Sequence, residues 1–244
     1  MKAPRTLCVI PARYASTRLP GKPLKSLGGR PLILHAVERA EAASAVDWSV
    51  VATDDERVAR VVREAGHDAV LTPELPSGTH RAAFVARKIN CRFVLNLQGD
   101  EPFMDPNLLN VLVARLAEGD VGIATAVHES ADHALYRDPN CVKAVLDARG
   151  NALYFSRSPV PFHRSGDGLA FFRHIGLYGF TKETLLACVT LPAGELERRE
   201  GLEQLRWLEA GHPIACILTD WHGVGVDTPE DLRRAERLLE TRGP

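Results

Sequence analysis

Strand-like and helix-like segments alternate along the first half of the chain, and this alternation constrains the fold more than any other feature. Short apolar runs rich in β-branched residues, such as 7–11 and 93–97, are typical of buried strands. Stretches with apolar residues at helical spacing lie between them. After about residue 140, strand-like segments follow one another with only turns between them, which predicts a mixed sheet. We therefore expect one α/β domain over residues 1–244, doubly wound and Rossmann-like, with a mixed sheet that has a mostly parallel core.

The individual elements can be placed by periodicity and by turn residues. The expected strands cover residues 7–11, 48–53, 69–71, 93–97, 121–127, 142–146, 152–155 and 172–180. The expected helices are one that opens at Pro31 and five that cover residues 56–65, 79–88, 107–116, 196–210 and 229–241. The last helix has a clear start, because Thr228 supplies a hydroxyl cap and Pro229 fits the first helical position.

Composition argues against several broad classes of protein. A formal net charge of -1 predicts no general affinity for nucleic acid or membranes, and no apolar run is long enough for membrane insertion. The five cysteines are far apart and form no CxxC pair, which indicates buried thiols in a reducing compartment. The acid-poor start could suggest a targeting peptide, but a strand and a Pro- and Gly-containing loop replace the expected amphipathic helix. We expect a cytoplasmic protein.

A basic loop follows the first predicted strand. Residues 11–23 contain Arg13, Arg18 and Lys22 together with small residues that leave backbone N–H groups accessible. Ligands of open α/β sheets bind beyond the carboxyl ends of the strands, so this loop is suited to wrap a triphosphate. The alternative is a solvated basic loop, although no acid within the loop balances its charge. The P-loop and GxGxxG patterns are both absent, which argues against an NAD-binding domain.

Two aspartates follow predicted strands. Asp100 comes after the apolar run at 93–97, and Asp227 ends a short apolar strand just before the last helix. A carboxylate in such a place costs free energy unless it binds something, and Mg²⁺ that bridges phosphates is an obvious partner. Taken alone, Asp100 also fits an Asx turn, and Asp227 also fits part of the helix cap. Opposite a cationic loop, the pair suggests a metal–triphosphate site.

A polar strand face is predicted near residue 175. Strand alternation places His174, Gly176 and Tyr178 on one face, which suits a hydroxylated substrate. The alternative is that the histidine and tyrosine are hydrogen-bonded core residues. No metal-ligand pair of histidines, Ser-His-Asp pattern or nucleophilic cysteine stands out in the sequence.

These segments resemble the 3-deoxy-manno-octulosonate (KDO) cytidylyltransferase family over nearly the whole chain. The matching segments are IPARYASTRLPGKPL (10–24), VATDDERV (51–58), SGT-R (77–81), NLQGDEP (96–102), DPN-VK (138–143), ALYFSRSPVP (152–161), RHIGLYGF (173–180), LEQLR (202–206) and GVGVDTPEDL (223–232). The long first block is specific, because related enzymes for other sugars open with Gly-richer or Lys-centred variants. One departure is His80, which stands where the family usually has Asp or Glu and leaves the details of base recognition open.

The resemblance implies an activity and a set of site residues. It implies a nucleotide-diphospho-sugar transferase type of fold, Mg²⁺ as cofactor, and transfer of CMP from CTP to KDO for lipopolysaccharide synthesis by a cytoplasmic homodimer. The residues that it assigns to CTP are Arg13, Arg18, Lys22, Ser77, Arg81 and Gln98, of which Arg18 and Lys22 are also catalytic. The residues that it assigns to the metal and to catalysis are Asp100 and Asp227. The residues that it assigns to the sugar are Arg157, His174, Tyr178, Glu203 and Gln204.

Two alternatives remain open from the sequence. The acceptor could be another 2-keto acid sugar, such as an 8-amino analogue of KDO or a sialic acid, because the phosphate motifs are shared. The chain could also be a non-catalytic nucleotide-binding regulator, although Lys22, Asp100 and Asp227 are all retained.

Overall fold

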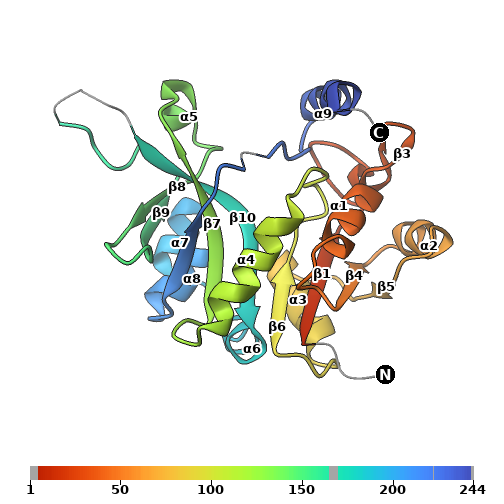
Figure 1. Cartoon of the computed structure of the whole chain (residues 1–244), viewed down its shortest axis with the longest axis horizontal. Helices are drawn as coiled ribbons and strands as arrows, with labels where there is room; N and C mark the ends of the chain where they lie inside the picture. The colour runs from red at the N-terminus through yellow and green to blue at the C-terminus, as the bar shows by residue number, and fades with distance from the viewer. Residues whose placement is uncertain (1–4, 165–169, 222, 243–244) are drawn as a thin grey trace. The chain divides into compact units, whose positions relative to one another are not determined.

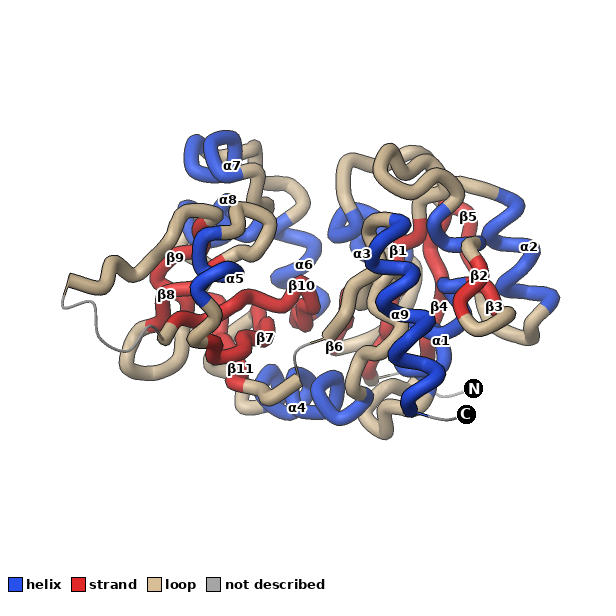
Figure 2. Tube along the Cα trace, turned by 90° about the horizontal axis from the view of Figure 1, so that it is seen from above, coloured by secondary structure: helices blue, strands red, loops and turns tan. Residues whose placement is uncertain are grey.

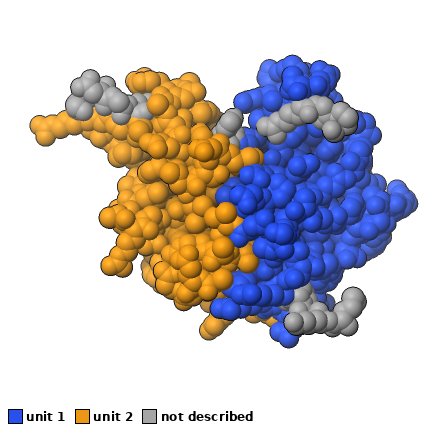
Figure 3. Space-filling view, in the orientation of Figure 1, with its two compact units in different colours: residues 1–110, 223–244 blue, residues 111–222 orange. Residues whose placement is uncertain are grey.

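The computed structural model describes residues 5–164, 170–221 and 223–242 of the chain. These residues form two compact units (Figure 3). Unit 1 comprises residues 1–110 and 223–244, and unit 2 comprises residues 111–222. The expectation of a single domain over residues 1–244 stays a prediction, and each unit is described by itself.

Unit 1 is built on four parallel strands in the order β6-β1-β4-β5 (Figure 1). These strands are β1 (Thr6–Ala12), β4 (Trp48–Thr53), β5 (Ala69–Leu71) and β6 (Phe93–Asn96). Every residue of β1 is buried, as expected for the central strand of a sheet that is covered on both faces. Because β1 and β6 are parallel, their carboxyl ends lie at the same edge of the sheet.

The helices of unit 1 follow the strands along the chain. They are α1 (Leu32–Glu41), α2 (Glu56–Glu64), α3 (Gly78–Ala86) and α9 (Pro229–Arg242), while α4 (Pro106–Ala117) runs across the boundary at residue 110. Side chains cap several of them: Asp55 accepts from the N–H of Arg57 at α2, Ser77 accepts from the N–H of His80 at α3, and Thr228 accepts from the N–H of Asp231 at α9, as predicted.

A small satellite core joins the C-terminal helix to the N-terminal part of unit 1. The 3-10 helix η1 (Lys22–Leu24) leads into a hairpin of β2 (Ser26–Leu27) and β3 (Arg30–Pro31). Helix α9 lies beside this hairpin, where Ala235 packs in one apolar cluster with Leu27 and Leu19 (Figure 2). This packing brings the segment before α9 next to the segment that contains Lys22.

Unit 2 contains a mixed sheet. Its strands are β7 (Ile123–Ser130), β8 (Lys143–Leu146), β9 (Ala152–Ser156), β10 (Phe171–Thr181) and β11 (Ile214–Leu218). β11 pairs with β7 in parallel, whereas β10 pairs antiparallel with β7 and β8, and β8 pairs antiparallel with β9. Its helices are α5 (His133–Arg137), α6 (Lys182–Cys188), α7 (Glu195–Glu200) and α8 (Gln204–Glu209).

The structure confirms the predicted α/β class, with a parallel core in unit 1 and a mixed sheet in unit 2. The strands expected at 48–53 and 69–71 have the predicted bounds. The short helices α5 and α6, the 3-10 helix η1 and the strands β2, β3 and β11 were not predicted. Among the described residues, no helix combines the length and the apolar character that crossing a membrane requires.

Two local predictions are wrong. The helix expected over 196–210 is broken into α7 and α8, because Gly201 adopts a left-handed φ of 63° and its N–H bonds the carbonyl of Glu197 at 2.7 Å. This geometry ends a helix and favours glycine. Asp227 does not end a strand, since residues 223–227 form no regular element; the N–H of Val226 instead bonds the carbonyl of Asp100 at 2.9 Å.

Candidate active site

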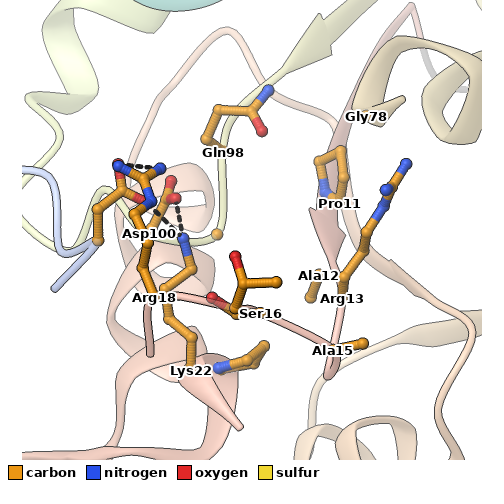
Figure 4. A pocket seen from close by; sticks show the side chains of 14 residues that line it. Pro11, Ala12, Arg13, Ala15, Ser16, Arg18, Lys22, Gly78, Gln98 and Asp100 are labelled. Atoms are coloured by element: carbon orange, nitrogen blue, oxygen red, sulfur yellow. Dashed lines mark hydrogen bonds and ion pairs between the residues drawn. The ribbon is translucent and has the colours of Figure 1, made fainter. Parts of the chain in front are cut away.

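A pocket of about 300 Å³ opens in unit 1 beyond the carboxyl ends of β1 and β6 (Figure 4). The residues that line it are Pro11, Ala12, Arg13, Ala15, Ser16, Thr17, Arg18, Lys22, Pro23, Gly78, Gln98, Gly99, Asp100 and Asp227. Figure 4 shows Arg18, Lys22 and Asp100 gathered on one side and Arg13 and Gly78 on the opposite side. Six residues that were predicted from the basic loop and the two carboxylate segments therefore meet in one pocket, as the position beyond the strand ends suggests.

The charged group on one side of the pocket is built around Lys22. Its Nζ contacts Asp100 Oδ2 and lies 2.9 Å from Asp227 Oδ1, and Arg18 Nη2 lies 3.2 Å from Asp227 Oδ2. Burial lowers the pKa of Lys22, but attraction to Asp100 and Asp227 and hydrogen bonds with them outweigh it, so the pKa is raised. Lys22 is therefore a permanent cation at the wall of the pocket.

The local fold of the basic loop brings Lys22 to this position. Gly21 caps the 3-10 helix with a left-handed φ of 68°, and its N–H bonds the carbonyl of Tyr14 at 3.2 Å. The Tyr14 ring stacks under the guanidinium of Arg57, with 3.5 Å from Cζ to the ring centroid. The loop thus folds back on itself and is held against the start of α2.

Gly99 allows the carboxylate segment to pass close to β1. A Cβ at this position would lie 2.8 Å from Ile33 Cδ1 and 3.1 Å from the carbonyl oxygen of Pro11. Both neighbours are buried. A side chain at position 99 would therefore require Ile33 and the end of β1 to shift.

We expect Gly99→Ala to destabilise the fold by about 1–3 kcal/mol, because the added methyl group overpacks a closed contact. The free energy of unfolding in urea measures this effect. Gly176→Ala is the matched control, since a Cβ at Gly176 meets nothing within 4 Å. Equal stabilities of the two variants would contradict the close approach of Gly99 to β1.

The two carboxylates fit a divalent cation. Asp100 and Asp227 come from segments far apart in the sequence, yet their oxygens converge on one positive charge, the Lys22 ammonium. Within the described part of the chain, no group of three or more His, Cys, Asp or Glu side chains forms a metal cluster. A site of only two carboxylates suits Mg²⁺, which commonly takes one or two carboxylates and completes its shell with water and substrate phosphates.

The predicted CTP residues Ser77 and Arg81 do not line this pocket. The Arg81 side chain is 0% exposed, and its guanidinium bonds Asp54 Oδ2 at 2.8 Å and contacts Thr72 Oγ1. Ser77 Oγ caps α3 and lies 2.8 Å from Nδ1 of His80. In this structure both residues hold α3 in place, and their direct contact with CTP stays a prediction.

The residues predicted for the sugar lie in unit 2. His174 and Tyr178 are in ring contact, with centroids 5.4 Å apart, and His174 Nε2 lies 2.9 Å from Thr125 Oγ1. A β-bulge between Ile175 and Tyr178 interrupts the alternation that the sequence predicted for this strand. The Tyr178 hydroxyl is buried and finds no hydrogen-bond partner among the described residues. Burial raises the pKa of Tyr178, and the nearby charge of Glu203 raises it further.

We expect His174 to make the fold less stable as the pH falls. Burial, aided by the charge of Arg173, lowers the pKa of His174 from 6.5 to about 3. Between these values the unfolded chain binds a proton that the folded chain does not, so the free energy of unfolding decreases as the pH drops from 6.5 toward 3. This contribution has a slope of at most about 1.4 kcal/mol per pH unit.

Urea unfolding of the parent protein and of His174→Gln between pH 4 and 7 measures this slope. The difference in stability between the two proteins is expected to shrink steadily as the pH falls. His133→Gln serves as the control, because it removes a solvent-exposed histidine. A difference for His174→Gln that stays constant with pH would contradict a buried neutral imidazole.

The sequence reasoning missed two charged residues of unit 2, the buried Lys143 and the half-buried Glu200. Lys143 is 0% exposed, and its Nζ donates to the carbonyls of Asp138, Cys141 and Arg157 at 3.0, 2.6 and 2.6 Å. Burial lowers the pKa of Lys143. Glu200 accepts from the N–H of Arg157 at 2.8 Å. Neither role has a local sequence signal, because a lysine within a strand normally predicts a solvent-facing position.

The other predicted sugar residues have different surroundings. The guanidinium of Arg157 donates to the carbonyl of Glu200 at 2.7 Å and to that of Pro139 at 2.9 Å, so it ties two segments of the chain together. Gln204 is buried at the start of α8, and Glu203 precedes it. Contact of these three residues with a sugar stays a prediction.

Comparisons with known proteins bear on the same segments. The family model described as "Cytidylyltransferase" matches residues 7–214. The chain is 48% identical over 234 residues to the 3-deoxy-manno-octulosonate cytidylyltransferase of Anaeromyxobacter dehalogenans (strain 2CP-C), covering 95% of this chain and 96% of the relative. It is 46% identical over 242 residues to the protein of the same name from Syntrophotalea carbinolica, covering 95% of this chain and 97% of that relative.

A solved structure agrees with these sequence matches. The fold superposes with a TM-score of 0.94 on CMP:2-keto-3-deoxy-manno-octonic acid synthetase complexed with CTP, at 37% identity, covering 98% of this chain and 100% of that chain. The match supports an α/β nucleotidyltransferase with a mixed, mostly parallel sheet. The chain therefore belongs to the 3-deoxy-manno-octulosonate cytidylyltransferase family and is a nucleotidyltransferase.

Proposed function

We propose that the protein transfers CMP from CTP to KDO, with CMP-KDO and pyrophosphate as products. The observation that carries this proposal is the pocket in which Arg18 and Lys22 face Asp100 and Asp227 beyond the ends of β1 and β6. The names of the relatives and of the CTP-bound structure support the choice of both substrates.

The reaction is a displacement at phosphorus. The anomeric hydroxyl oxygen of KDO bonds to the α-phosphorus of CTP, the bond from this phosphorus to the oxygen that bridges to the β-phosphate breaks, and pyrophosphate leaves. The hydroxyl proton passes to solvent. Such chemistry depends on positioning and charge neutralisation rather than on covalent help from the protein. Lys22, Arg18 and Arg13 would bind the phosphate chain and stabilise the charge that accumulates on pyrophosphate.

Asp100 and Asp227 would hold Mg²⁺ in this site. The bound ion would supply positive charge next to the phosphates and favour ionisation of the attacking hydroxyl. The Lys22 ammonium now lies between these carboxylates, and we propose that it turns to the phosphates of CTP when the carboxylates hold the metal. This exchange keeps each charge in the pocket paired.

The sugar would be recognised by unit 2 residues, namely Arg157, His174, Tyr178, Glu203 and Gln204. The buried, unpartnered hydroxyl of Tyr178 supports this assignment, because such a donor costs free energy until a ligand accepts its hydrogen bond. Neutral His174 is suited to hydrogen bonding with a sugar hydroxyl. We also propose, from the family resemblance, that the protein acts as a cytoplasmic homodimer that activates KDO for lipopolysaccharide synthesis.

One assay tests the function as a whole. The protein is mixed with each of the four nucleoside triphosphates and with KDO, 8-amino-KDO or a sialic acid in the presence of Mg²⁺, and pyrophosphate release and product mass are measured. We expect release only with CTP, and fastest with KDO. Preference for another acidic sugar would correct the acceptor, whereas CTP binding without pyrophosphate release from any sugar would indicate a nucleotide-binding regulator.

A further inference from the structure

Asp227 stands in a segment without regular structure, yet backbone hydrogen bonds fix this segment on both sides. The N–H of Val226 bonds the carbonyl of Asp100 at 2.9 Å, and the N–H of Asp227 bonds Asp231 Oδ2 at 3.2 Å. Val226 is fully buried in the same apolar cluster as Ala235 of α9. The backbone is therefore held immediately before Asp227 and at Asp227 itself.

Asp231 connects Asp227 to the first turn of α9. The oxygen that accepts from Asp227, Oδ2, also accepts from the N–H of Thr228 at 2.9 Å and from its hydroxyl at 2.8 Å. In return, Thr228 Oγ1 accepts from the N–H of Asp231 at 3.1 Å. These reciprocal bonds form a capping box, in which the acid reaches back to the N–H of the cap residue. The bond to Asp227 lies one residue beyond the box, so the helix cap alone does not account for it.

The backbone at Asp227 determines where its carboxylate lies. This side chain is 43% exposed, so packing does little to hold it, and its oxygens lie 2.9 Å from Lys22 Nζ and 3.2 Å from Arg18 Nη2. In the reaction proposed above, Lys22 turns to the phosphates of CTP and no longer holds the carboxylate. The bond between the Asp227 N–H and Asp231 does not depend on this movement, because it is made by the backbone.

We propose that Asp231 is a positioning residue that holds the Asp227 carboxylate in the pocket and thereby strengthens the binding of Mg²⁺ together with CTP. Asp231 is not among the described residues that line the pocket, so it acts through Asp227. Partners that orient a metal ligand typically change metal affinity by about 10- to 100-fold when they are removed. The inference rests on the proposed binding of Mg²⁺ by Asp100 and Asp227, and deepens it by naming what orients the second carboxylate.

The test is the Mg²⁺ concentration that gives half-maximal CTP binding, measured by calorimetry without any sugar so that no CMP is transferred. Asp231→Ala removes the acceptor and is expected to raise this concentration by about tenfold or more. Glu230→Ala is the matched control, because it removes the same charge from the same turn of α9 at a side chain that is 88% exposed. It is expected to leave the Mg²⁺ requirement unchanged. An unchanged requirement in Asp231→Ala, or an equal rise in both variants, would overturn the proposal.

Thr228→Val separates the positioning role from helix capping. This variant removes the hydroxyl that caps α9 but keeps the acceptor for the Asp227 N–H. We expect it to lower the thermal stability about as much as Asp231→Ala does, while it changes the Mg²⁺ requirement much less. If Asp231 only capped the helix, stability and Mg²⁺ affinity would fall in parallel in the two variants, which would contradict the positioning role.

Asp231→Asn is a further variant that does not depend on how Asp231→Ala folds. Its amide keeps an oxygen that can accept from the Asp227 N–H, so a Mg²⁺ requirement close to that of the parent protein is expected. A rise as large as that in Asp100→Asn would show that the charge of Asp231 matters rather than its hydrogen bond, and would overturn the proposal. Parent protein that binds CTP with Mg²⁺ but transfers no CMP would contradict the proposed function alone.

Discussion

Lys22→Met is expected to lower kcat/KM for CTP by about 10³-fold or more, because preorganised charge at a developing oxyanion contributes several kcal/mol to the transition state. Lys22 is 17% exposed at its side chain and lies between Asp100 and Asp227 in the pocket. Methionine has a similar length and removes only the charge. Steady-state pyrophosphate release at saturating KDO measures the loss.

The control for this prediction is Lys25→Met in the same loop. Lys25 is exposed, does not line the pocket and follows η1 directly. We expect it to keep near-normal activity, which would show that the loss at Lys22 is not a general effect of loop charge. Retention of more than about one tenth of the activity by Lys22→Met would contradict its role at the phosphates.

Asp100→Asn is expected to abolish turnover while the fold remains intact. The change is nearly isosteric, but it removes one of the two charges that would hold Mg²⁺. We expect kcat to fall by about 10³-fold or more and the Mg²⁺ concentration needed for half-maximal residual activity to rise. Kinetics as a function of Mg²⁺ concentration measure both effects, and thermal unfolding checks the fold.

An exposed aspartate serves as the matched control for this variant. Asp120→Asn makes the same chemical change at a side chain that is 64% exposed and paired only with Arg115 among the described residues. Its Mg²⁺ dependence is expected to equal that of the parent protein. Near-normal activity of Asp100→Asn would exclude Asp100 as a metal ligand.

Periodicity predicted most of the regular elements because local sequence and burial agree there. Strand β4 contains the apolar β-branched pair Val50 and Val51, and five of its six residues are buried in the sheet. The helix predicted over 196–210 is wrong, because the apolar pattern continues across Gly201. At that residue the backbone adopts a left-handed φ, and helix α7 ends. Strand β11 was missed because five apolar residues alone do not distinguish a strand from a loop.

The chemistry of the site was predictable where it depends on charge at strand ends. Arg18, Lys22 and Asp100 meet as expected, and Asp227 joins them although it follows no strand. Roles that depend on burial could not be predicted. Nothing in the segments around them reveals that Arg81 is fully enclosed by its partners or that Lys143 holds three carbonyl groups, since tertiary packing decides both.

A crystal structure of the protein with CTP and Mg²⁺ tests the central claim most directly. We predict that the phosphate chain lies in the pocket of unit 1, with Lys22 on the phosphates and the ion on Asp100 and Asp227. Phosphates bound away from the 11–23 loop, or carboxylates at positions 100 and 227 that contact neither ion nor nucleotide, would contradict the account.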